Sequence, residues 1–138
     1  EINGTYTYSG EAQEPGNGDT TQVQVTLDNI PVNSSEYTLG YANNTAAAEA
    51  SSNAAPTVTV KAIADGNYTG TVSKTFTILR KPLTVTAENK KVTYKEDAPE
   101  FTAVYDGFVG EETLAGVGGT ISFLCEYENG SPVGDYEI

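Results

Sequence analysis

Apolar and polar residues alternate along much of the chain, which is the pattern of β-strands that bury one face. The alternation is clearest over residues 57–62, where Val58, Val60 and Ala62 are separated by polar side chains. The same period of two predicts further strands in both halves of the chain, at residues 22–27, 36–41, 72–78, 83–87, 92–94, 101–105 and 121–127. Hardly any segment has the spacing of an amphipathic helix. An all-β fold is therefore predicted.

Turn-forming dipeptides separate the predicted strands, and they favour the same interpretation. These dipeptides are Asp65-Gly66, Asp106-Gly107, Gly118-Gly119 and Asn129-Gly130. Two stretches lack strand alternation. Residues 45–55 are rich in alanine and end before Pro56, which predicts a long loop or a short helical insertion. Residues 111–114 are long enough for a single helical turn.

A boundary between two modules is predicted near Arg80 to Pro82. Residues 67–78 and 81–87 are both rich in Thr and Val, and a lone proline separates the strands that they predict. The chain has 138 residues, of which 38 % are hydrophobic, and this is enough for two small domains. We therefore predict two consecutive β-sandwich-like modules, residues 1–80 and 81–138, with a connector short enough to restrict bending.

The strongly acidic composition limits the possible partners. The chain has 19 Asp and Glu residues against 7 Lys and Arg, for a net charge of −12. This balance disfavours nucleic acids and anionic lipid surfaces as partners. No stretch is apolar over the length of a bilayer, so no membrane insertion is expected. A signal peptide and an initiating Met are both absent, and we expect the sequence to be a fragment of a larger chain.

The residue types predict no catalytic or metal site, and no enzyme activity or cofactor is expected. The chain has no histidine, which removes the usual general base, the commonest zinc ligand and every histidine-based triad. Paired acids occur as Glu96 with Asp97, Glu111 with Glu112, and Glu126 with Glu128. Glu96, Asp97 and Glu100, or Glu111 with Glu112, could supply oxygen ligands for calcium, but neither set has the spacing of a dedicated calcium loop. We expect these acidic turns to be solvated instead. The glycine run at 116–119 precedes a predicted strand, which favours a hairpin turn over a phosphate loop.

Two single residues depart from the surrounding pattern. Cys125 is the only cysteine and so forms no disulfide within the chain. Because it shares a strand face with Phe123 and Tyr127, we expect a buried and unreactive side chain. Lys74 interrupts the apolar face of residues 72–78. An edge strand or a bulge would explain this lysine, and an isopeptide bond to an asparagine is the alternative.

The nine tyrosines raise the question of carbohydrate binding, since aromatic faces can stack on sugars. Tyr94, Tyr105 and Tyr127 lie on the apolar faces of their predicted strands, which indicates core positions. Tyr6 and Tyr8 are the least committed to a core. The chain has no tryptophan, and core packing is the preferred interpretation for most tyrosines.

Three blocks of the first module carry a family resemblance. They are Tyr6–Pro15, Glu36–Asn44 and Gly66–Ile78. In this order they resemble a bacterial Ig-like β-sandwich repeat that occurs in tandem in large surface proteins, especially of Gram-positive bacteria. The resemblance covers about residues 5–79 and departs at the alanine-rich stretch, where the family usually has a short turn containing glycine.

The second module, residues 81–138, carries a different resemblance. The matching positions are Leu83–Ala87, Tyr94, Asp97–Pro99, Gly107–Val109, Glu112–Leu114 and Val133–Ile138. They resemble the mostly-β MBG repeat of bacterial surface and adhesin-like proteins. Lys95 stands where that family commonly has glycine. Such modules normally continue into further strands, so an incomplete module with an open strand edge is expected at the C-terminal end.

Both resemblances imply a non-catalytic spacer or stalk segment of a secreted or surface-anchored bacterial protein, located outside the cell. The alternative is an adhesin or carbohydrate-binding module. A monomer without cofactors is expected. Any host or glycan ligand would be bound through the parent protein, and the sequence predicts no ligand-binding residues.

Overall fold

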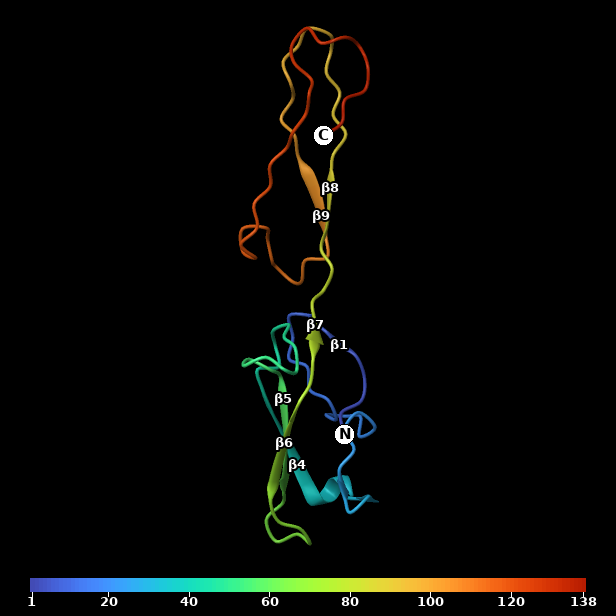
Figure 1. Ribbon diagram of the computed structural model, residues 1–138, viewed down its shortest axis with the longest axis vertical. Coiled ribbons are helices and arrows are strands. Elements are labelled where there is room, and N and C mark those ends of the chain that lie inside the picture. The colour runs from blue at the N-terminus through green and yellow to red at the C-terminus, as the bar shows by residue number, and fades with distance from the viewer. The chain divides into compact units, whose positions relative to one another are not determined.

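The computed structural model describes all residues from Glu1 to Ile138 (Figure 1). Its regular elements are nine short β-strands and one 3-10 helix, which confirms the predicted all-β fold. The chain divides into two compact units, Glu1–Lys81 and Pro82–Ile138. No helix has the length and the apolar character that crossing a bilayer requires.

The first unit is built around a three-stranded antiparallel sheet in the order β4-β5-β6. Its strands are β4 (Tyr37–Ala42), β5 (Thr57–Ala62) and β6 (Thr71–Thr75). They lie where the alternation of apolar residues predicts strands. β6 pairs with β5 alone, and Lys74 is exposed on this edge strand. Sheets commonly carry lysine at an edge because it blocks further pairing.

A parallel pair joins the first and last strands of this unit. β1 (Tyr6–Thr7) pairs with β7 (Ile78–Leu79), and the next amide, of Tyr8, donates a 2.8 Å hydrogen bond to the last carbonyl of β7. On the other edge of β7, Ile78 exchanges two backbone hydrogen bonds of 3.0 Å with Ala48. The alanine-rich residues 45–55 form a loop, which pairs with β7 at Ala48 and then makes two turns, closed by backbone hydrogen bonds from Ser52 to Glu49 and from Ala55 to Ser52.

The predicted strand at residues 22–27 is shorter than expected. Only its end, β2 (Thr26–Leu27), is a strand, and it forms a tight hairpin with β3 (Ile30–Pro31). The turn residues Asp28 and Asn29 have φ angles of 49° and 64°. Two-residue hairpin loops favour this left-handed geometry, and Asp and Asn tolerate it.

A 3-10 helix, η1 (Ser34–Glu36), leads from the hairpin into β4. The side chain of Asn33 caps it by accepting a 2.9 Å hydrogen bond from the amide of Ser35. The carboxylate of Glu36 accepts hydrogen bonds from both the backbone and the side chain of Asn67, at 3.1 and 2.8 Å. These bonds tie the start of β4 to the turn between β5 and β6.

The core of the first unit is small and lies around Val58, Phe76 and Ile78, which are all buried. Partly buried side chains from the start of the chain pack against it, including those of Tyr6 and Tyr8. The ring of Tyr6 meets Phe76 edge-on, with 5.2 Å between ring centroids. Tyr6 and Tyr8, for which the sequence predicts no clear core position, thus pack against the core.

The second unit contains one two-stranded antiparallel sheet, of β8 (Thr84–Ala87) and β9 (Ala103–Asp106). The strands predicted at residues 92–94 and 121–127 do not form, and those two predictions are wrong. The side-chain alternation is nevertheless present in the second of these segments. Phe123, Cys125 and Tyr127 are half-buried, while the residues between them are exposed.

No side chain of the second unit is fully buried. Its packing depends on aromatic contacts such as Phe101 with Phe123, whose ring centroids lie 6.0 Å apart. The expectation of a buried Cys125 is accordingly wrong, because this side chain is only half-buried. A single two-stranded sheet has no second layer to cover it.

Gly107, in the turn after β9, brings two backbone segments into close contact. Its φ is +118°, and a Cβ placed there would lie 2.3 Å from the carbonyl oxygen of Pro82. Only glycine avoids that clash and adopts this φ without strain. The dipeptide Asp106-Gly107 is thus a turn, as the sequence predicts, and it also fixes the start of the second unit.

Candidate functional site

Three of the paired acids of the second unit, Glu96, Asp97 and Glu112, accept hydrogen bonds from the protein itself. The carboxylate of Glu96 accepts a 3.0 Å hydrogen bond from the amide of Thr93, and Glu112 binds the amide of Val109 in the same way. The side chain of Asn129 donates to the Asp97 carboxylate at 3.0 Å. No group of three or more His, Cys, Asp or Glu side chains is placed to hold a metal ion.

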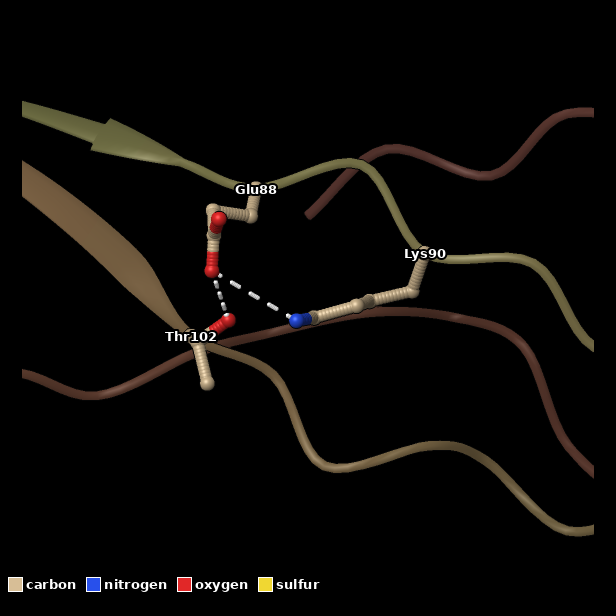
Figure 2. A network of polar contacts seen from close by, with 3 residues as sticks. All are labelled: Glu88, Lys90 and Thr102. Atoms are coloured by element: carbon tan, nitrogen blue, oxygen red, sulfur yellow. Dashed lines mark hydrogen bonds and ion pairs between the residues drawn. The ribbon is translucent and has the colours of Figure 1, made fainter.

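A polar cluster links the end of β8 to the residue before β9 (Figure 2). The hydroxyl of Thr102 donates to the carboxylate of Glu88, and the ammonium of Lys90 lies 3.5 Å from the same carboxylate. The hydrogen bond from Thr102, followed by the charge of Lys90, lowers the pKa of Glu88. The backbone amide of Glu88 also donates to the carbonyl of Thr102 at 2.9 Å. The cluster extends the β8–β9 pairing by one position and presents no free reactive group.

The second unit also contains a cavity of about 580 Å³. Four aromatic rings line it, and they come from separate segments of the chain: Tyr94, Phe101, Tyr127 and Tyr136. Sites for small ligands commonly have such volumes and such aromatic linings. The sole cysteine, Cys125, lies in the same wall.

Hydrogen bonds hold two of these rings in place. The hydroxyl of Tyr127 donates to the carbonyl of Glu96, and that of Tyr136 donates to the carbonyl of Pro132, both at 2.7 Å. The two rings meet at 72° with their centroids 5.4 Å apart. Partial desolvation and the nearby Glu96 carboxylate raise the pKa of Tyr127. Both hydroxyls therefore bind backbone carbonyls of the protein, and the two tyrosines contribute the surface of their rings to the cavity.

Polar side chains complete the wall of the cavity. Asn89, Lys91 and Asp135 line it, and none of them has a hydrogen-bond or ion-pair partner within the protein. They are free to bind polar groups of a ligand. The cavity thus combines oriented apolar rings with a few unpaired polar groups.

Alternation along single strands predicts core positions for Tyr94 and Tyr127, and it misses this cavity. Tyr94 is 53 % exposed, so its predicted core position is wrong. Alternation shows which side chains share a face, but it cannot distinguish a packed face from one that lines an open cavity. The only signal in the sequence is the concentration of aromatic residues in the second module.

A second hollow, of about 180 Å³, lies in the first unit between its N-terminal segment and the sheet. Its wall is mainly aliphatic, with Ile2, Val23 and Val25 facing Val58 and Val60. It contains no aromatic ring. This hollow is a gap between two loosely packed layers. It offers fewer groups for binding a ligand than the cavity of the second unit does.

Comparison with known protein families gives a match in the C-terminal part of the chain. Residues 83–138 match the family model of the MBG domain of the YGX type. The match lies within the second unit and does not reach residues 5–79, where the sequence resembles an Ig-like repeat. No curated protein and no solved structure matches the chain. Over residues 83–138, the chain is therefore similar to the MBG domain, as the sequence predicts.

Proposed function

We propose that this chain is a non-catalytic spacer segment of a secreted or surface-anchored bacterial protein. The observation that carries the proposal is the MBG match over residues 83–138, because this domain indicates a repeat of bacterial surface proteins. An extracellular location and an origin in Gram-positive bacteria belong to the same proposal.

The architecture of the first unit supports a tandem of β-modules. β7 ends at Leu79 and β8 begins at Thr84, so only residues 80–83 separate the last strand of the first unit from the first strand of the second. Pro82 has a fixed φ and restricts this connector further. The antiparallel sheet, together with the parallel pairing of first and last strands, is the kind of β-module that a tandem spacer would repeat.

A spacer needs no reactive chemistry, and its role follows from length and stability. The test is display on a bacterial surface, with the chain placed between a cell-wall anchor and an epitope tag. Deleting the chain should lower antibody access to the tag. Replacing it with an unrelated pair of β-modules of equal length should restore that access. If only the native sequence restores access, spacing is not the function.

An adhesin or carbohydrate-binding module is the second candidate, and one observation favours it. None of the tyrosines is fully buried, and three of them line the cavity of the second unit. A binding function needs exposed aromatic surface of this kind, whereas a passive spacer does not.

A further inference from the structure

The aromatic cavity of the second unit has the composition of a sugar-binding site. Sugars with flat apolar faces stack on aromatic rings, while their hydroxyls bind polar side chains around the rim. The rings of Tyr94, Tyr127 and Tyr136 supply the first element. The unpaired side chains of Asn89 and Asp135 supply the second.

Two of the three rings are oriented before any ligand arrives. Tyr127 and Tyr136 are fixed by hydrogen bonds to backbone carbonyls. The ammonium of Lys95, which does not line the cavity, lies 5.4 Å from the ring centroid of Tyr94. A pre-oriented site loses less conformational entropy on binding. Tyr94 is also the most exposed of the three rings, so its face is accessible to a ligand.

The charge of the surroundings selects among sugars. Acidic side chains far outnumber basic ones in residues 82–138, so the field of this unit repels polyanionic glycans. The lining of the cavity contains Asp135 as well as Lys91, and Lys90 is already paired with Glu88. No free cluster of cations is left to bind a carboxylate or sulfate.

We propose that this cavity binds a neutral oligosaccharide, with Tyr94, Tyr127 and Tyr136 as the stacking surface. The proposal rests on the second candidate function, and it names the site and the ligand class. A spacer role does not depend on it, so the display experiment and the binding experiment fail independently.

Cys125 provides a built-in reporter for the test. It is the only cysteine of the chain and it lines the cavity, so a bound ligand should slow its reaction with a thiol reagent. The probes are two neutral β-linked oligosaccharides, N-acetylchitohexaose and cellohexaose, and heparin as the polyanion. The rate is measured on the intact chain over a range of probe concentrations. We expect saturable protection by at least one neutral probe and none by heparin.

Two tyrosine variants make the test specific. Tyr94→Ala should raise the probe concentration needed for half-maximal protection of Cys125 roughly tenfold, which is the scale of losing one aromatic contact. Because this side chain is exposed, the substitution should leave the fold intact. Tyr68→Ala is the matched control, since Tyr68 is 38 % exposed in the first unit and far from Cys125 in sequence. It should leave protection unchanged.

Three outcomes would overturn the proposal. Protection by neither neutral probe up to its solubility limit would show that the cavity does not take such sugars. Stronger protection by heparin would show that the ligand is anionic. Protection that grows with protein concentration alone would show that a second copy of the chain fills the cavity.

Discussion

At the scale of single residues, Glu88 is the charged side chain with the best-defined surroundings in the second unit. Its pKa is lowered first by the hydroxyl of Thr102 and then by Lys90. A lowered pKa means that the ionised form is favoured in the folded state. The stabilising contribution is therefore present above the ordinary pKa of glutamate and is lost as the pH falls through the lowered value.

Removing the stronger of the two interactions should raise the pKa of Glu88. We expect Thr102→Val to move the pKa back toward the usual range of glutamate, because the valine side chain cannot donate a hydrogen bond. The shift can be measured by NMR titration of the Glu88 side-chain carboxyl. Acid should then neutralise Glu88 at a higher pH than in the parent protein.

Lys90→Met is the matched comparison, since it removes the charge and keeps the aliphatic stem. It removes both the charge of Lys90 and its hydrogen bond to Glu88, so it should also raise the pKa of Glu88. A larger effect of the lysine variant would show that the ion pair, and not the hydrogen bond in Figure 2, dominates this cluster.

The sequence shows directly which residue types this chain contains, but it does not show the surroundings of each side chain. The absence of histidine is read directly from the sequence. The exposure of Tyr94 and the half-burial of Cys125 are not, because both depend on whether a second layer covers the apolar face. The cavity results from that missing cover, and a periodic pattern contains no information about it.

At the scale of elements, β7 connects most of the first unit. It pairs with β1 on one edge and with Ala48 on the other, and its Ile78 is 2 % exposed. We expect Ile78→Ala to lower the free energy of unfolding of this unit by about 2–5 kcal/mol, the usual cost of truncating a buried isoleucine. Chemical denaturation followed by tyrosine fluorescence measures this loss.

The same substitution at an exposed isoleucine is the control. Ile30 is 68 % exposed in the β2–β3 hairpin, and Ile30→Ala should change the free energy of unfolding by less than about 0.5 kcal/mol. Similar losses at both positions would mean that the core does not lie around β7.

Elements with a paired neighbour are the ones that the sequence predicts well. The strands β4, β5, β8 and β9 coincide with alternating segments, because each finds a hydrogen-bonded partner over four or more residues. Residues 121–127 have an equally clear alternation but no neighbouring strand, so they remain irregular. Whether a segment finds a strand to pair with depends on distant parts of the chain, so local periodicity cannot predict it.

At the scale of the whole molecule, the two units differ in how much they bury. The first has a small core, whereas the second has no fully buried side chain. Amide hydrogen exchange should therefore be slower in β5, which lies between two strands, than in β8, which pairs on one edge only. Exchange monitored by NMR gives both values in one sample. Equal or greater protection in β8 would contradict the difference in packing.

The parallel pairing of β1 with β7 has a consequence for a protein held under tension. Because the two strands run in the same direction, pulling the start of β1 and the end of β7 apart slides one past the other. Their backbone hydrogen bonds are then strained together in shear and cannot open one after another like a zipper. The two strands where the chain enters and leaves the first unit would therefore be the contacts that resist a pull on its two ends.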